Sequence, residues 1–218
     1  MTADRLDQAR ALAEDVLARH LDHLPASLAA IERTRFLGSP VAPGLIDVVL
    51  RMEAEREVEV VERWLEHKLE GTVALRGPEG TREVPLRGIA DRVDLLSDGT
   101  FRVIDYKTSR ASGPLQIALY ATALRQRLAA YRGRAWVVGE AAYVAFRDDP
   151  PVKPLARTPA DLDAAIAREE ARALAIVEGI ERGEFPPRPA QRSLCNTCAW
   201  AGVCRKDYVE ADQPELAV

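Results

Sequence analysis

Residues 88–107 (GIADRVDLLSDGTFRVIDYK) constrain the fold of this chain more than any other stretch. Apolar and polar residues alternate in two runs, on either side of Ser97-Asp98-Gly99-Thr100. Such alternation is typical of half-buried β-strands, and an Asp-Gly pair between two strands is typical of a tight hairpin turn. The stretch therefore predicts two antiparallel strands, a hairpin that any α/β domain can contain.

The predicted hairpin carries two acids and a lysine close together. Side chains alternate between the two faces of a strand, so Asp105 and Lys107 share one face. On the preceding strand, the same alternation groups Asp91 with Ile89 and Val93. If the two faces match, Asp91 lies beside Asp105 and Lys107. The opposite face of the preceding strand is predicted to carry Arg92 and Asp94.

Two close carboxylates repel each other unless a cation or a proton lies between them. Mg²⁺ and Mn²⁺ prefer oxygen ligands, retain several waters and accept a phosphate oxygen as a further ligand. Lys107 adds a compact positive charge that can orient a metal-activated water and stabilise a phosphorane. These groups point to metal-assisted phosphodiester hydrolysis. The alternative from spacing alone is an ordinary same-face salt bridge between Asp105 and Lys107.

Three motifs of the chain resemble those of the PD-(D/E)XK nuclease superfamily. They are Gly88-x-x-Asp91-Arg92-Val93-Asp94, Asp105-Tyr106-Lys107-Thr108 and Gln116-x-x-x-Tyr120. Their order and spacing are most similar to the RecB/AddB-like branch of that superfamily. The resemblance implies an α/β fold with a mixed central β-sheet flanked by helices, in a restriction-endonuclease-like core.

The same resemblance implies a set of catalytic residues. This set is Asp91, Asp105, Lys107, Gln116 and Tyr120. In the family the two acids bind the metal, a role that would be shared by the backbone carbonyl of Tyr106, and the lysine is catalytic. The glutamine and the tyrosine lie on the next helix and help to hold the site and the DNA strand. The implied cofactor is Mg²⁺ or Mn²⁺, and the implied substrate is DNA.

Periodicity and turn signals outline the rest of the chain. Residues 3–35 have leucine and alanine at helical spacing, with a break at Pro25. A long amphipathic helix is expected over residues 45–69, with Trp64 and Leu65 packed inward. Further strands are expected at residues 72–75, 83–86, 135–138 and 142–146, further helices at residues 115–131 and 159–182, and a surface loop at residues 148–159. Thr158 is the predicted N-cap of the last helix, with Pro159 in its first turn.

All three cysteines lie near the end of the sequence, as Cys195-x-x-Cys198-x5-Cys204. In a cytoplasmic protein, cysteines at such spacing indicate a metal or cluster site and not a disulfide. The pattern resembles the C-terminal part of the iron–sulfur motif of AddB-type nucleases, in which a fourth cysteine lies far upstream. The chain has no fourth cysteine. The G-x-x-x-H histidine of many relatives has no clear counterpart, because Gly44-Leu45-Ile46-Asp47 offers only an aspartate.

These departures leave three interpretations open. The chain is the C-terminal piece of a longer helicase–nuclease subunit, or a stand-alone protein with an altered site, or a protein in which Asp, His or water completes the cluster. The first is favoured because the chain begins within a helical pattern. A [4Fe-4S] cluster is then expected only if a fourth ligand is supplied, with weakly held zinc or free thiols as the alternatives.

Length and composition fit one soluble globular domain. A chain of 218 residues can bury a substantial core, and its 47% hydrophobic and 29% charged residues are ordinary values. There is no secretion signal and no apolar run of membrane length, so a cytoplasmic location is predicted. The expected division is a helical region at residues 1–44, a nuclease core at residues 45–186 and a cysteine-containing tail at residues 187–218, packed on the core.

The sequence thus predicts a Mg²⁺-dependent deoxyribonuclease, expected to be the exonuclease module of a RecB/AddB-like double-strand-break repair enzyme with a helicase partner. A formal net charge of −4 argues against coating of nucleic acid through bulk charge, but allows a local basic groove. One alternative is an impaired nuclease-like module that only binds DNA or a partner subunit. Another is a small metal-binding protein in which the cysteines are the function. Intact Asp91, Asp105 and Lys107 favour an active nuclease over an impaired module.

Overall fold

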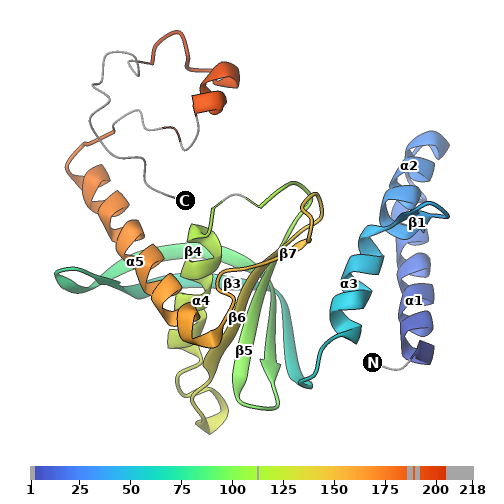
Figure 1. Cartoon of the computed structure of the whole chain (residues 1–218), viewed down its shortest axis with the longest axis horizontal. Coiled ribbons are helices and arrows are strands. Elements are labelled where there is room, and N and C mark those ends of the chain that lie inside the picture. The colour runs from blue at the N-terminus through green and yellow to red at the C-terminus, as the bar shows by residue number, and fades with distance from the viewer. Residues whose placement is uncertain (1–2, 112, 186–188, 190–191, 205–218) are drawn as a thin grey trace.

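The computed structural model describes residues 3–111, 113–185, 189 and 192–204. One twisted β-sheet forms its centre, with α4 (Leu115–Arg127) and α5 (Pro159–Glu181) packed on one face (Figure 1). Three N-terminal helices pack on one another at the right of that view: α1 (Ala3–Leu21), α2 (Ala26–Leu37) and α3 (Leu45–Ala54). This arrangement confirms the predicted α/β class, with a mixed sheet flanked by helices.

The sheet has five strands in the order β3-β4-β5-β6-β7. Their bounds are β3 (Val60–Gly77), β4 (Gly80–Leu96), β5 (Thr100–Lys107), β6 (Val137–Ala145) and β7 (Val152–Pro154). β5 and β6 run parallel, whereas the other neighbouring pairs are antiparallel. A parallel pair needs a crossover connection, and here α4 lies within that crossover. The hairpin predicted from residues 88–107 therefore occupies the middle of the sheet.

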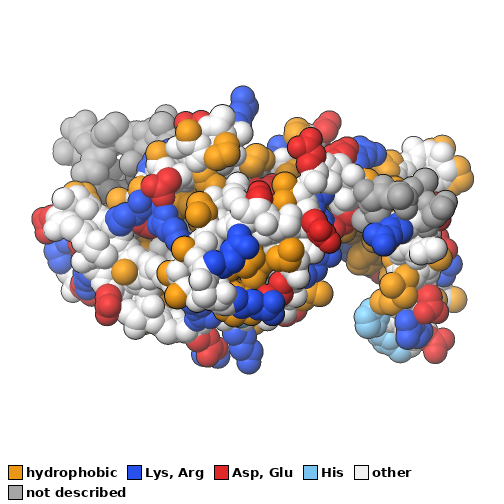
Figure 2. Space-filling view, turned by 90° about the horizontal axis from the view of Figure 1, so that it is seen from below, with side chains coloured by type: hydrophobic (Ala, Val, Ile, Leu, Met, Phe, Trp, Pro, Cys, Tyr) orange, Lys and Arg blue, Asp and Glu red, His pale blue; other side chains and the backbone are white. Residues whose placement is uncertain are grey.

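The remaining elements are short. β1 (Gly38–Ser39) pairs with β2 (Ala42–Pro43) between α2 and α3, and two 3₁₀ turns occupy Tyr131–Gly133 and Arg192–Thr197. None of the helices within the described ranges combines the length and the apolar character needed to cross a membrane. On the face drawn in Figure 2, basic and acidic side chains are interspersed.

Several local predictions are confirmed. Gly99 has a φ of 89°, a left-handed conformation that glycine adopts without strain, and its N–H donates to the carbonyl of Leu96 at 3.1 Å. The hairpin turn therefore lies at Asp98 and Gly99, as predicted. The N-terminal helical region is broken before Ala26, next to Pro25. Thr158 caps α5, because its hydroxyl accepts a hydrogen bond from the N–H of Asp161.

The helix predicted over residues 45–69 is wrong beyond its first ten residues. α3 ends at Ala54, and β3 begins at Val60. Tertiary pairing with β4 decides the conformation, since β3 finds hydrogen-bond partners along almost its whole length. Trp64 packs against the core, whereas Leu65 is 65% exposed, because neighbouring side chains of a strand point to opposite faces.

Three further boundaries differ from the predictions. The strands expected at residues 72–75 and 83–86 are parts of the much longer β3 and β4. The strands expected at residues 135–138 and 142–146 are not separated at Gly139 and Glu140. They form the continuous strand β6, which has a register shift at this point in its pairing with β5. The loop expected at residues 148–159 contributes the edge strand β7, which pairs with β6.

The core lies between the sheet and helices α4 and α5. Side chains from all three layers meet there at 0–1% exposure, including Leu69, Leu95, Phe101, Leu124 and Ile166. Each large apolar side chain buried in this way contributes roughly 1.5–3 kcal/mol. α4 is therefore held firmly against the end of β5, where the candidate site lies.

Candidate active site

The junction of β4 and β5 brings two aspartates together. The strands pair antiparallel, and Arg92 lies opposite Ile104. The pairing ends there, and Asp91 and Asp105 are the next residues of the two strands. The Oδ2 atom of Asp91 accepts a hydrogen bond at 2.7 Å from the backbone N–H of Tyr106. Asp91 thus lies beside the segment that carries Asp105, as the sequence predicts.

The strand faces are less regular than alternation predicts. Ile89 is 46% exposed and Val93 is fully buried, so these two residues do not share an environment. Ala90 and Val93 both belong to the core although they are three residues apart, which shows that alternation is interrupted at Asp91. The neighbouring strand is irregular at the same level, because Glu66 has a φ of 50°. The predicted grouping of Asp91 with Ile89 is therefore wrong.

Four side chains converge at the end of β5. The Nζ atom of Lys107 lies 2.6 Å from Oδ2 of Asp105 and donates to Oε1 of Gln116 at 2.9 Å. The Nε2 atom of Gln116 donates to Oδ1 of Asp105 at 3.2 Å and to the hydroxyl of Tyr120 at 3.1 Å. Gln116 and Tyr120 share one face of α4, because they are four residues apart. The structure thus brings the predicted residues together.

The glycine of the first motif makes room for Tyr120. A Cβ atom at Gly88 would lie 2.8 Å from Cε1 of Tyr120 and 3.0 Å from its hydroxyl oxygen. Only a residue without a side chain allows α4 to approach β4 so closely. Gly88 therefore positions the helix face that carries Gln116.

Asp105 has an unusual electrostatic environment. It is 2% exposed, and this burial raises the pKa of its carboxyl. The ammonium group of Lys107 opposes the rise, and the negative charge of Asp91 adds to it. Although Oδ2 of Asp105 contacts Lys107 at ion-pair distance, this buried oxygen has no contact with hydrogen-bond geometry among the residues that the structure describes. Its environment would therefore favour an additional cation.

The oxygens at this site suit Mg²⁺ or Mn²⁺. Asp91 and Asp105 supply carboxylates, and the backbone carbonyl of Tyr106 is the third candidate ligand; all are hard oxygen donors. Within the ranges that the structure describes, no three His, Cys, Asp or Glu side chains gather to hold a metal by themselves. Water and phosphate oxygens would have to complete the coordination, which is common for Mg²⁺.

Comparison with known families decides the kind of protein that carries this site. Residues 2–205 match the family model described as the PD-(D/E)XK nuclease superfamily. The chain belongs to the PD-(D/E)XK nuclease superfamily. Membership indicates a nuclease and agrees with the mixed sheet flanked by helices. A search of curated proteins gave no match.

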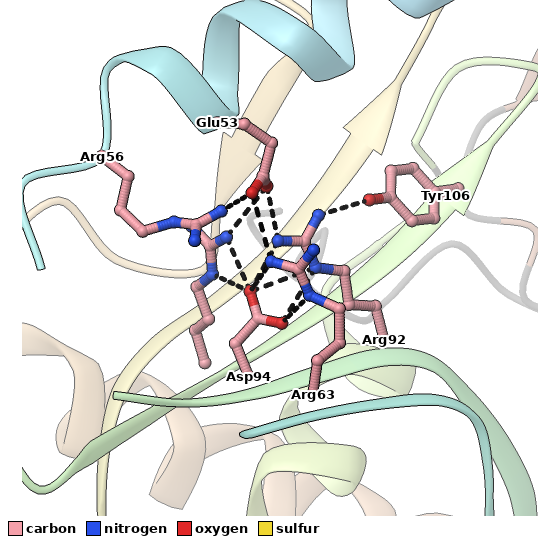
Figure 3. Close-up of polar contacts among 7 residues, drawn as sticks. Glu53, Arg56, Arg63, Arg92, Asp94 and Tyr106 are labelled. Atoms are coloured by element: carbon pink, nitrogen blue, oxygen red, sulfur yellow. Dashed lines mark hydrogen bonds and ion pairs between the residues drawn. The ribbon is translucent and has the colours of Figure 1, made fainter. Parts of the chain in front are cut away.

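An arginine cluster lies on the sheet face opposite the core of this PD-(D/E)XK domain (Figure 3). It consists of Glu53, Arg56, Arg63, Arg92, Asp94 and Arg102. The carboxylate of Asp94 is fully buried and accepts hydrogen bonds from Arg63 at 2.6 Å, Arg92 at 2.6 Å and Arg102 at 2.7 Å. Glu53 reaches the same guanidinium groups from α3, so the cluster ties α3 to the sheet.

The cluster also gives Asp94 an environment different from that of Asp91. Arg92 and Asp94 share one environment, as predicted, and Arg92 also donates to the hydroxyl of Tyr106 at 3.1 Å. Burial alone would raise the pKa of Asp94, but hydrogen bonds from Arg92 and Arg63 lower it well below the usual range. Asp94 is thus fully engaged by arginine, whereas Asp91 faces Asp105.

Tyr143 also lies at this candidate site and was not predicted from the sequence. It lies on β6 beside Asp105, and its ring centroid is 5.5 Å from Nζ of Lys107. No local signal marks it, since its place depends on the parallel register across the α4 crossover. Glu70, on β3, pairs with Arg87 at 3.5 Å.

The cysteines lie in and after the 3₁₀ turn Arg192–Thr197. Cys198 is exposed, whereas Cys195 and Cys204 are half-buried, and these described residues do not form a metal-binding group with one another. Trp200 and Val203 are 73% and 76% exposed, so they do not anchor this segment by burial. The iron–sulfur site implied by the resemblance therefore has no preformed metal-binding group among the described residues. Tyr208, which with Trp200 and Val203 would have to hold the tail by ordinary packing, lies outside the described residues.

Proposed function

We propose that the chain is a metal-dependent deoxyribonuclease whose site is built on Asp91, Asp105 and Lys107. The observation that carries the proposal is the contact between a buried carboxylate and a lysine, beside a second carboxylate. Asp91, Asp105 and the backbone carbonyl of Tyr106 would hold Mg²⁺ or Mn²⁺. Such an ion, when bound, lowers the pKa of water and offsets negative charge on a phosphate.

The other side chains would orient the site. Lys107 would stabilise the negative charge that develops on the phosphate oxygens. Gln116 contacts both Lys107 and Asp105 and so fixes their relative position. Tyr120 accepts a hydrogen bond from Gln116 and would hold its amide.

The proposed biological setting is narrower than the family. The motif spacing supports a RecB/AddB-like exonuclease that hydrolyses DNA during double-strand-break repair, with a helicase subunit or domain as partner. The alternative is an impaired module that binds DNA or a partner without cutting. The intact contact between Lys107 and Asp105 favours cleavage.

Incubation with labelled DNA tests the function. Linear single- and double-stranded DNA with labelled ends, and closed circular DNA, would each be given Mg²⁺, Mn²⁺ or a chelator. The proposal predicts loss of linear DNA with either metal, none with chelator, and survival of the circles. Cleavage of the circles would show that the chain is an endonuclease and not an exonuclease. Intact DNA under all conditions would favour a module that binds DNA without cutting it.

Changes on α4 should affect cleavage less than loss of the lysine. Gln116→Ala and Tyr120→Phe should each lower the rate by about 10-fold, because they orient charged groups without carrying the charge themselves. Single-turnover rates measured alongside Lys107→Ala check this order. Effects equal to that of Lys107→Ala would show that α4 takes part directly in the chemistry.

The cysteines give a separate prediction about cofactors. A cubane cluster needs four ligands, and Cys195, Cys198 and Cys204 provide three, so we propose that a stable cluster needs a ligand from outside this chain. The purified chain should be colourless or hold zinc weakly. Metal analysis and visible absorption check this, and a brown chromophore stable in air would contradict it.

A further inference from the structure

Tyr143 lies between the candidate catalytic lysine and the start of α4. Its side chain is buried, and strand pairing places it next to Asp105 on β6. Burial, followed by the charges of neighbours such as Asp105, raises the pKa of Tyr143 to about 12. A tyrosine hydroxyl is protonated at neutral pH even without this shift, so the residue acts as a neutral polar group.

The hydroxyl of Tyr143 serves as a cap for α4. The first N–H groups of a helix have no partner within the helix. At α4, the N-cap residue Pro114 supplies no side-chain hydrogen bond. The backbone N–H of Ile117 instead donates to the Tyr143 hydroxyl at 3.2 Å. Because Ile117 directly follows Gln116, this bond fixes the helical turn that presents Gln116 to the site.

The ring of Tyr143 contacts the lysine. The Nζ atom of Lys107 lies 5.5 Å from the ring centroid, within the range of a cation–π interaction. Asp105 and Gln116 hold the same ammonium group through polar contacts. The ring therefore limits the positions that the ammonium group can reach.

We propose that Tyr143 is a positioning residue of the nuclease site. Its ring holds the ammonium group of Lys107, and its hydroxyl holds the turn that carries Gln116. This role rests on the proposed nuclease function. Tyr143 acts through these two residues and not through a contact of its own with DNA.

Two substitutions separate the ring from the hydroxyl. Tyr143→Leu removes both and should lower the single-turnover cleavage rate by about 10-fold, whereas Tyr143→Phe keeps the ring and should stay within about threefold of wild type. The KM for DNA and the dissociation constant for Mn²⁺ should not change. Tyr131→Phe is the control. It removes the hydroxyl of a half-buried tyrosine that donates to Glu62 at 3.0 Å and does not contact the lysine.

A double-mutant cycle tests whether the effect passes through the lysine. With Lys107→Ala as background, Tyr143→Leu should lower the remaining rate by no more than about threefold, the loss expected from the hydroxyl alone, since the ammonium group that the ring positions is gone. A full additional loss in that background would overturn the proposal. So would a parallel loss of Mn²⁺ affinity, which would show general disruption of the site.

An NMR measurement without DNA keeps this test apart from the nuclease function. The ε-methylene protons of Lys107 should show a ring-current shift in wild type and in Tyr143→Phe, but not in Tyr143→Leu. A wild-type chain that cuts DNA but lacks the shift would overturn the positioning role alone. A chain with the shift that cuts no DNA would contradict the nuclease function, and the positioning role with it.

Discussion

Replacing Lys107 by alanine should lower the rate of DNA cleavage by about 100- to 1000-fold, because it removes the positive charge that would face the reacting phosphate. The fold should persist. The lysine side chain is 27% exposed, and Asp105 keeps its hydrogen bond from Gln116. The free energy of unfolding should therefore change by less than about 1 kcal/mol. Single-turnover cleavage and urea unfolding, measured on the same preparations, check both parts.

Lys68→Ala provides the matched control for this change. Lys68 is an exposed lysine on β3, so its loss should alter neither the cleavage rate nor the stability. If Lys107→Ala lost activity together with much of its stability, Lys107 would have a structural role.

Asp94→Asn should destabilise the fold by about 3–5 kcal/mol, because it leaves buried arginines without one of their two carboxylates. Asp91→Asn should change the free energy of unfolding by less than about 1 kcal/mol, since within the described part of the chain Asp91 has no arginine partner to lose. Urea unfolding of the two variants measures the difference. Equal losses would contradict the division of these acids into a site residue and a structural residue.

The stabilisation by Asp94 should also depend on pH in one direction. Its pKa in the folded protein is lowered from the ordinary value of 3.8, so its contribution is complete above that value and declines as the pH falls further. The stability difference between wild type and Asp94→Asn should be constant between about pH 5 and 7 and shrink only below about pH 4. A difference that shrinks within the upper interval would contradict the lowered pKa.

The hairpin and its chemistry could be predicted because their signals are local. The Asp-Gly turn, the alternation in β5 and the spacing of Gln116 from Tyr120 each depend on a few neighbouring residues. These short-range patterns predicted that Asp91, Asp105 and Lys107 lie close together, and the resemblance to the nuclease superfamily added Gln116 and Tyr120. They did not reveal that β4 is irregular at Asp91. This irregularity lies opposite a positive φ at Glu66 on the neighbouring strand, and a local pattern carries no information about a strand distant in sequence.

The remaining errors concern long-range pairing. The charged first half of β3 has apolar residues that also fit a helix, and only its ladder with β4 makes it a strand. The arginine cluster draws Glu53, Arg63 and Arg102 from three separate elements, and Tyr143 reaches the site across a crossover. Sequence spacing carries no information about such contacts, because they depend on the register and stacking of distant elements.

Binding of Mn²⁺ to the protein without DNA is the most direct measurement of the proposed metal site. Isothermal titration should show metal binding by wild type, weakened at least about 10-fold in Asp91→Asn and in Asp105→Asn, since each loses a charged oxygen ligand. Lys68→Ala should bind as wild type does. Equal Mn²⁺ affinity in wild type and in both aspartate variants would contradict a metal site between Asp91 and Asp105.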